Sequence, residues 1–358
     1  MHANKDLKRV RRALALRFEF TSSTRKDEYM AISIRSLGLG TVLAIGLSGY
    51  AAAQSPDQVT LRYLASHGSL SAHELASELG YFDGTGIKLE NVGYASGGPE
   101  SLFGLASGSV DIGSAATSAV INSIASGNDF VAAYPTNGIN EQVKSIFYVL
   151  EDSPIKSIED IAGKTIAVNT LGAHLDYAIR EALHSKGLPQ NAANLVTVPG
   201  PQLEQTLRSK QVDIAAVGYW QATFNGQIVA NGGVRAVFDD TDVLGEIAGG
   251  FAVLRRDFVE EHPDAARNFV EQSARAADWS RENPEEARAL LAKILEKRGE
   301  NGALAKHWTG FGLRPGARAT ERDLDFWIGV LEREGSLPQG KYKASDLLLQ
   351  TSASAAAN

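Results

Sequence analysis

The sequence contains no cysteine among its 358 residues. Disulfides, iron–sulfur clusters, thiolate zinc sites and cysteine nucleophiles are therefore excluded, as is a lipid-anchored amino terminus, which needs a cysteine at its processing site. An excess of positive charge is also missing, because the formal net charge is −7, so nothing supports binding to nucleic acid. The composition, 44% hydrophobic and 22% charged, is typical of a soluble globular protein long enough for two domains.

Long hydrophobic runs are absent as well. The most apolar stretch, residues 37–47, is too short to cross a bilayer as a stable helix. Three small residues, 51–53, follow it in the manner of a cleavage site. We therefore predict that residues 1–53 are a cleaved signal peptide and that the protein is exported, with Met30 as an alternative start. An uncleaved membrane anchor is the competing interpretation.

Motifs for catalysis and metal binding are missing too. The seven histidines show no metal-ligand spacing, and the chain has neither an HExxH pair nor a GxSxG elbow. Residues 162–165 look like half a phosphate-binding loop, but they enter a predicted strand instead of following one, so we interpret them as a turn. The sequence therefore predicts no catalytic residue, no metal and no cofactor.

Strands alternating with helices are what the sequence does contain. Strand patterns begin near Val59, Ile87, Phe130, Lys164 and Val212, which favours an α/β fold with a largely parallel sheet. Ligands of such sheets bind outside the carboxyl ends of the strands. A brief strand is also expected at residues 110–113. The candidate site loops are residues 65–69, 95–98, 114–118, 169–173 and 218–221.

An internal repeat indicates two lobes. The Gly-Pro pair at residue 98 recurs at residue 200, and Val110-Asp111-Ile112 recurs as Val212-Asp213-Ile214, at one offset of 102 residues. We interpret this as two similar lobes that present helix N-termini to a shared cleft. Lobe 1 is predicted to comprise residues 54–148 and 248–350, lobe 2 residues 149–247, and the tail 351–358 is expected to be disordered. Asp111 and Asp213 lie ahead of the loops, which favours a structural role over acid–base catalysis.

The candidate loops combine small residues and hydroxyls with helix starts, a design that suits a small anion. None of them contains Lys or Arg, which favours a monoanion or a neutral polar ligand. Four side chains in or beside the loops are predicted to contact the ligand, with a surface or core position as the alternative for each: His67, His174, Tyr219 and Trp220.

Three segments resemble the substrate-binding proteins of ABC importers for aliphatic sulfonates, taurine and nitrate. They are residues 105–113, the run DSPIKSIEDIAGKTIAV at 152–168, and residues 211–214. The resemblance, which covers about Val59 to Glu286, implies a type II periplasmic-binding-protein clamshell, each lobe a mixed, mostly parallel sheet flanked by helices. It implies a monomeric periplasmic protein that captures a small monoanion by hinge closure and delivers it to a membrane permease and its ATPase.

The resemblance also implies ligand contacts at the strand ends. The acidic residue and proline that usually follow the second-lobe tryptophan are absent after Trp220, which puts the group on the ligand's far end in question. A pyrimidine thiamine precursor is the alternative ligand, which Tyr219 and Trp220 could stack against. A sensory binding protein would share these features, and an enzyme on the same fold is less favoured. The implied contacts are Ser66, His67, Gly68, Ser96, Gly97, Ala116, Thr117, Leu171 and Gly172.

Overall fold

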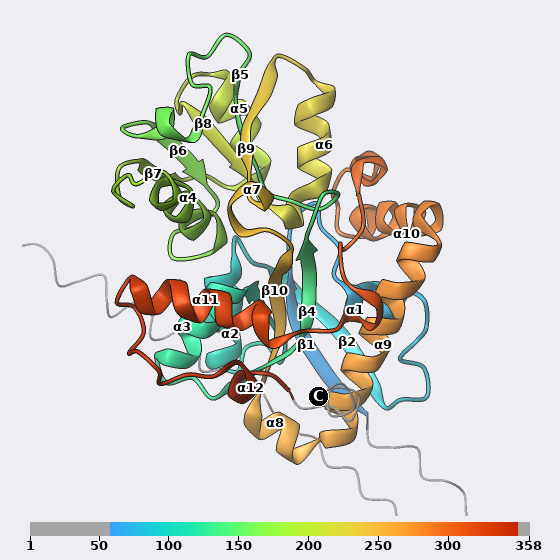
Figure 1. Ribbon diagram of the computed structural model, residues 1–358. Helices are drawn as coiled ribbons and strands as arrows, with labels where there is room; N and C mark the ends of the chain where they lie inside the picture. Colours follow the sequence, from blue (N-terminus) through green and yellow to red (C-terminus); the bar gives the residue numbers. More distant parts are fainter. Residues whose placement is uncertain (1–57, 350–358) are drawn as a thin grey trace, which may run out of the picture. The chain divides into compact units, whose positions relative to one another are not determined.

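A computed structural model describes residues 58–349 (Figure 1). The predictions of a signal peptide and of a disordered tail lie outside these residues. The strands are β1 (Val59–Ala65), β2 (Ile87–Tyr94), β3 (Gly113–Ala116), β4 (Phe130–Ile139), β5 (Ile146–Leu150), β6 (Thr165–Val168), β7 (Asn194–Thr197), β8 (Ile214–Val217), β9 (Val234–Asp239) and β10 (Ile247–Arg255).

The α-helices fall between and after the strands. They are α1 (Ala72–Glu78), α2 (Gly98–Ala106), α3 (Thr117–Ala125), α4 (His174–Ser185), α5 (Leu203–Arg208), α6 (Ala222–Ala230), α7 (Thr241–Leu244), α8 (Arg256–Glu261), α9 (Pro263–Glu282), α10 (Pro284–Lys297), α11 (Glu321–Arg333) and α12 (Ala344–Leu347). Short 3-10 turns are η2 (Ile158–Ile161), η3 (Gly200–Gln202), η4 (Tyr219–Gln221), η5 (Gly302–His307) and η6 (Pro315–Ala317).

Local sequence signals explain several element boundaries. Ser71 and Glu74 form a capping box at α1, and Pro99 occupies the first turn of α2. The strand predicted at residues 110–113 is wrong in position, because β3 starts only at Gly113. The amides of Asp111 and Ile112 both donate to the carbonyl of Arg62, so this segment is tied to the end of β1 before the strand begins.

The strands form two layers that correspond to two lobes. The five-stranded sheet has the order β7-β6-β8-β5-β9, with β6 parallel to β7 and β8, and β5 antiparallel to its neighbours. In the other layer β3, β10 and β4 are antiparallel, and a bridge between Tyr63 and Ile112 joins them to the parallel pair β1-β2. Both sheets are mixed and flanked by helices, as the fold prediction states (Figure 1). The expectation of mostly parallel sheets is wrong, because β5 and β10, which follow the two passages between the layers, run antiparallel to all their named neighbours in the described chain.

The chain passes between the two layers twice. Residues 140–145 connect β4 to β5, and residues 240–246 connect β9 back to β10. The predicted lobe boundary at residue 148 falls inside β5, which pairs with β8 and β9 in the five-stranded sheet. The apolar pattern of residues 145–150 predicts a strand, but it carries no information about which sheet the strand joins.

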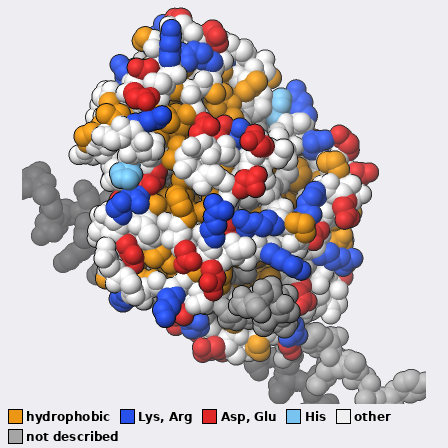
Figure 2. Space-filling view, viewed as in Figure 1, with side chains coloured by type: hydrophobic (Ala, Val, Ile, Leu, Met, Phe, Trp, Pro, Cys, Tyr) orange, Lys and Arg blue, Asp and Glu red, His pale blue; other side chains and the backbone are white. Residues whose placement is uncertain are grey.

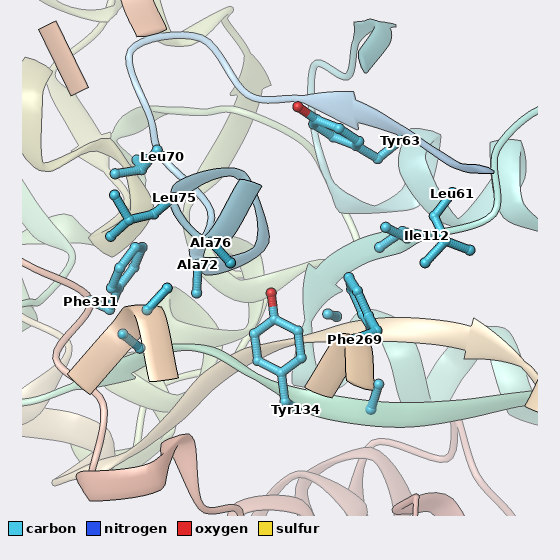
Figure 3. Packing of buried hydrophobic residues seen from close by; sticks show 14 of the residues in the cluster. Leu61, Tyr63, Leu70, Ala72, Leu75, Ala76, Ile112, Tyr134, Phe269 and Phe311 are labelled. Carbon is cyan, nitrogen blue, oxygen red and sulfur yellow. The ribbon is translucent and has the colours of Figure 1, made fainter. Parts of the chain in front are cut away.

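Each layer has apolar packing of its own, and a further cluster joins the two layers. In the layer of β1, the rings of Tyr134 and Phe269 lie 5.6 Å apart, and Leu75 of α1 belongs to the same cluster, which joins α1, α9 and β4 (Figure 3). In the five-stranded sheet, Phe147 of β5 stacks on Phe238 of β9, with ring centroids 4.0 Å apart. Helix α11 covers α3 and β10 with the fully buried Trp327.

The internal repeat is visible in the hydrogen bonds. The Asp111 carboxylate accepts from the amide of Arg62 at 2.9 Å, and the amide of Asp111 donates back to the Arg62 carbonyl at 2.8 Å. In lobe 2, Asp213 makes the same exchange with Thr165, at 2.8 and 2.9 Å. Both aspartates therefore tie a helix–strand turn to the neighbouring parallel strand, and the predicted structural role is confirmed.

Gly138 of β4 is expected to tolerate no side chain. A Cβ added there would lie 2.0 Å from the carbonyl oxygen of Gly312, which is backbone and cannot rotate away. We expect Gly138→Ala to lower the free energy of unfolding by about 1–3 kcal/mol, the usual cost of overpacking. Gly329, inside α11, has open space around its Cα, so Gly329→Ala should instead raise stability by up to about 1 kcal/mol. Urea denaturation of both variants measures the contrast, and equal effects would contradict it.

Candidate ligand-binding site

A cavity of about 340 Å³ opens between the loops at the strand ends of both lobes. Lobe 1 contributes the loops after β1 and β2 and the end of β3, and lobe 2 contributes the loops after β6 and β8. Such a volume suits a small molecule. The polar residues that line it are Tyr63, Ser66, His67, Ser69, Ser71, His73, Glu74, Ser96, Ser114, Thr136, Asn137, Asn169, His174, Gln202, Tyr219, Trp220 and Gln221.

Three helices begin at the wall of this cavity. Their N-cap residues are Gly97 for α2, Ala116 for α3 and Ala173 for α4, and all three line the cavity. At each of these three ends, all within the described chain, no side chain caps the helix. The first amides of a helix carry unsatisfied donors and partial positive charge. The arrangement therefore concentrates hydrogen-bond donors around a single small volume.

Fixed charge contributes little to the cavity wall. None of the lining residues, all within 58–349, is Lys or Arg. Glu74 is the carboxylate among them, and it is engaged by Arg298 and by the Tyr63 hydroxyl, which donates to it at 2.9 Å. Burial raises the pKa of Tyr63 to about 12, so this hydroxyl stays protonated at neutral pH. The wall of lobe 1 is thus electrically neutral overall.

The loop after β1 is held from both lobes. The amide of Gly68 donates to Glu300 at 2.7 Å, and its carbonyl accepts from the hydroxyl of Thr223 in lobe 2 at 2.6 Å. His67 stacks on Tyr94, with ring centroids 4.1 Å apart, and its Nδ1 lies 3.5 Å from Glu300. The loop that carries His67 is therefore a place where the two lobes touch.

A buried histidine–aspartate pair supports the wall of lobe 2. The Nε2 of His174 lies 2.7 Å from Asp240 Oδ2, and both side chains are fully buried. Asp240 also accepts from the amide of Ser145 at 2.8 Å. The ring of Tyr219 meets His174 edge-on at 4.9 Å and Trp220 edge-on at 4.8 Å. The three aromatic side chains therefore form one packed cluster beside the cavity.

The structure brings eight of the twelve predicted ligand contacts to the cavity wall: Ser66, His67, Ser96, Gly97, Ala116, His174, Tyr219 and Trp220. Gly68 lies just behind it, between Glu300 and Thr223. Thr117 is buried behind Ala116 and donates to the Ala248 carbonyl. Leu171 is half exposed, and the Gly172 amide donates to Asp176 at 2.8 Å. A ligand contact by any of the twelve stays a prediction.

Several residues that shape the site were missed by sequence reasoning. Asn169 and Gln221 line the cavity, and Thr223, Asp240 and Glu300 fix its loops. Asn169 and Gln221 belong to candidate loops, so their position was available from the sequence. Glu300 lies 232 residues along the chain from its partner Gly68, and Asp240 lies 66 residues from its partner His174. No local sequence pattern indicates such distant partners.

Thr117 is expected to act mainly through stability. Its hydroxyl is buried and donates to the Ala248 carbonyl at 3.2 Å, which links α3 to β10. Thr117→Val keeps the shape but removes the donor, so we expect a loss of about 1–3 kcal/mol in the free energy of unfolding. Thermal denaturation measures the stability of the variant, and titration calorimetry measures its affinity for the ligand. A loss of affinity at unchanged stability would instead favour the ligand contact that the sequence predicts.

Other kinds of site find no support in the described chain. Residues 58–349 contain no group of three or more His, Asp or Glu placed to hold a metal ion. None of their helices has the length and apolar character needed to cross a bilayer. On the face shown in Figure 2, acidic and basic side chains are interspersed over both the upper and the lower part, without a continuous basic stripe.

Comparison with known proteins identifies the family. The family described as NMT1/THI5 like matches residues 72–287, more than half of the chain. The chain belongs to the NMT1/THI5-like family. A relative of this NMT1/THI5-like protein in Escherichia coli (strain K12), provisionally named an aliphatic sulfonates-binding protein, is 26% identical over 270 residues, which cover 74% of this chain and 79% of the relative.

Solved structures show the same fold as this NMT1/THI5-like protein. The periplasmic aliphatic sulphonate binding protein SsuA from Escherichia coli matches with a TM-score of 0.64 at 22% identity, over 83% of this chain and 94% of SsuA. The periplasmic nitrate-binding protein NrtA from Synechocystis PCC 6803 matches with a TM-score of 0.61 at 16% identity, over 82% of this chain and 86% of NrtA. The predicted periplasmic-binding-protein fold is thereby confirmed.

Proposed function

We propose that this protein is the extracytoplasmic solute-binding component of an ABC importer and that it captures a small monoanion, such as an alkanesulfonate, taurine or nitrate, between its lobes. The observation that carries the proposal is the convergence of the starts of α2, α3 and α4 on one cavity that lacks Lys and Arg. Helix starts each favour an anion by about 0.3–1 kcal/mol, and by up to about 2 kcal/mol in partly buried positions.

Contacts between the lobes support capture by closure. Besides the bond from Thr223 to Gly68, the side-chain Nδ2 of Asn122 in α3 donates to the Tyr177 hydroxyl in α4 at 3.0 Å. The two contacts join the lobes through different pairs of segments. A ligand that meets both lobes would stabilise this arrangement by its differential affinity for it.

The remaining parts of the proposal follow from the role of a binding component. A membrane permease and its ATPase are the proposed partners, the protein works as a monomer in the periplasm after removal of residues 1–53, and it catalyses no reaction. This is supported by the relative named an aliphatic sulfonates-binding protein and by the two solved binding proteins, both described as periplasmic. A small aromatic heterocycle such as a pyrimidine thiamine precursor is the second candidate ligand, favoured by Tyr219 and Trp220 at the cavity wall.

A thermal-shift screen of the purified protein tests the proposal. The panel contains taurine, ethanesulfonate, nitrate and 4-aminopyrimidine. A ligand at about 100 times its dissociation constant stabilises the native state by about 2.7 kcal/mol. A shift with a sulfonate or nitrate is the expected result. A shift with 4-aminopyrimidine alone would favour the aromatic heterocycle over the anion as the ligand. If no compound of the panel shifted the melting temperature, that result would count against both proposed ligand classes.

A matched pair of variants tests whether helix dipoles hold the anion. Gly97 is the N-cap of α2, and Asp and Asn are equally good N-caps of similar size. Both add a Cβ that lies 3.0 Å from Asn169 Nδ2, so the two variants share this crowding and only their difference is interpreted. Gly97→Asp adds a negative charge at the cavity wall, whereas Gly97→Asn adds none. Two unit charges about 4 Å apart repel by about 4 kcal/mol at an effective dielectric constant near 20. We therefore expect the Asp variant to bind the anion at least tenfold more weakly than the Asn variant. Equal affinities would indicate an uncharged ligand.

A further inference from the structure

Asn169 is the first residue after β6, and its side chain lies at the meeting point of the lobes. The residue lines the cavity and is 5% exposed. Its Nδ2 reaches the carbonyl of Ser96 at 3.5 Å, and a Cβ added at Gly97 would lie 3.0 Å from the same nitrogen. The amide group therefore extends from lobe 2 to the loop of lobe 1 that starts α2.

The Oδ1 atom of Asn169 is buried and accepts no hydrogen bond within the described chain. Buried polar atoms are nearly always paired, and an unpaired one costs about 1–3 kcal/mol. This oxygen belongs to a residue that lines the cavity, so a bound molecule can supply the missing donor.

A second unpaired atom lies on the same side of the cavity. His174 Nε2 contacts the carboxylate of Asp240, which can only accept, so Nε2 carries the hydrogen. His174 Nδ1 is likewise buried and has no hydrogen-bond partner within the described chain. Lobe 2 therefore holds two buried polar atoms without a partner, of which Asn169 Oδ1 is an acceptor, whereas the three helix starts present donors.

We propose that Asn169 Oδ1 selects ligands that carry a hydrogen-bond donor, an amino or hydroxyl group, a few bonds away from the group held by the helix starts. The inference rests on the proposed function and names a specificity-determining residue for it. A cationic amino group meets no fixed positive charge at this wall, since neither Lys nor Arg lines the cavity among residues 58–349. A plain anion would leave the oxygen of Asn169 unpaired.

Paired probes that differ in one donor test the inference. Titration calorimetry compares taurine and 2-hydroxyethanesulfonate with ethanesulfonate, and 4-aminopyrimidine with pyrimidine. Within the pair that binds, we expect the donor-bearing probe to bind at least tenfold more tightly to the unaltered protein. In Asn169→Leu this preference should fall to less than threefold. Asn169→Asp keeps an acceptor oxygen and should retain the preference for the uncharged donors of 2-hydroxyethanesulfonate and 4-aminopyrimidine, which its added charge does not attract as it attracts the ammonium of taurine.

Two controls separate selection from folding. Asn194 of β7 is exposed, and its side chain donates to the Gly163 carbonyl at 3.4 Å, so Asn194→Leu should leave the preference unchanged. Asn169→Leu removes the unpaired Oδ1 and also the bond from Nδ2 to the Ser96 carbonyl, so its melting temperature without ligand is compared with that of Asn169→Asp, which loses the same bond.

The outcomes distinguish this inference from the proposed function. Equal affinity for both members of a pair, or a preference that survives in Asn169→Leu, would overturn the role of Asn169 while the binding function stands. If only the pyrimidine probes bound, the proposal of an anionic ligand would be wrong. The role of Asn169 would then be tested by comparing 4-aminopyrimidine with pyrimidine. No binding by any probe would overturn both.

Discussion

Replacing Asp240 by alanine is expected to lower the free energy of unfolding by about 3–5 kcal/mol, the usual cost of breaking a buried pair by removing one partner. Asp240 and His174 are both fully buried, and their contact measures 2.7 Å. The variant leaves the His174 Nε2 hydrogen and the Ser145 amide without their acceptor. Because His174 lines the cavity, the affinity for the ligand should fall as well.

The control for this prediction is an ion pair at the surface. Asp152 lies 3.6 Å from Lys210, and both side chains are more than two-thirds exposed. Exposed pairs contribute about 0–1 kcal/mol, so Asp152→Ala should leave the urea midpoint almost unchanged. If Asp240→Ala changed the free energy of unfolding as little as Asp152→Ala, the His174–Asp240 pair would not stabilise the fold. The surrounding aromatic side chains would then account for the stability of this part of lobe 2.

The stability of the protein is expected to fall in mildly acidic solution because of His73. The ring is 2% exposed, and its Nδ1 lies 2.7 Å from the Tyr134 hydroxyl. Burial, assisted by the charge of Arg298, lowers the pKa of His73 to about 3. In the unfolded chain the pKa is about 6.5, so the unfolded state takes up a proton that the folded state does not.

The sign of the effect follows from this lowered pKa. The contribution of His73 is fully present above about pH 6.5, and it is lost at about 1.4 kcal/mol per pH unit as the pH falls toward 3. His73→Phe removes the titrating group, and the neighbouring ring of Phe269, whose centroid lies 5.6 Å from that of His73, suits the new ring. The variant also leaves the Tyr134 hydroxyl without this partner, so its stability at pH 7 should be lower.

The quantity to measure is therefore the slope of the free energy of unfolding against pH, not the free energy at one pH. Unfolding by urea between pH 6 and pH 4.5 should show a smaller loss in His73→Phe than in the unaltered protein. The exposed His184 provides the control, and His184→Gln should keep the original slope. Equal slopes in all three proteins would mean that His73 accepts a proton in the folded state, against the environment that the structure gives it.

Sequence reasoning predicted the parts of this protein that depend on local pattern. The repeated Val-Asp-Ile triplets led to two similar lobes because Asp111 and Asp213 perform the same task beside Arg62 and Thr165. The positions of the site loops followed from the ends of the strands.

What the sequence left open depended on distant partners. Glycine and hydroxyl residues in a loop indicate free donors only as long as nothing else in the fold binds them. Gly68 is hydrogen-bonded to Thr223 and Glu300, and Thr117 is hydrogen-bonded to Ala248. These partners lie between 131 and 232 residues away along the chain. The sequence therefore indicated which loops meet, but not which atoms in them remain available to a ligand.

A cavity whose attraction comes from peptide dipoles responds to the medium differently from one that uses lysine or arginine. Ions in solution screen exposed charges over about 8–10 Å at physiological ionic strength, but they screen buried partners much less. The starts of α2, α3 and α4 are part of the folded backbone, and Ala116 and Ala173 offer no side-chain charge for counterions to gather around. Salt also weakens the attraction between a helix start and an anion, so capture should weaken as salt rises, but less steeply than in a site built from exposed Lys or Arg side chains.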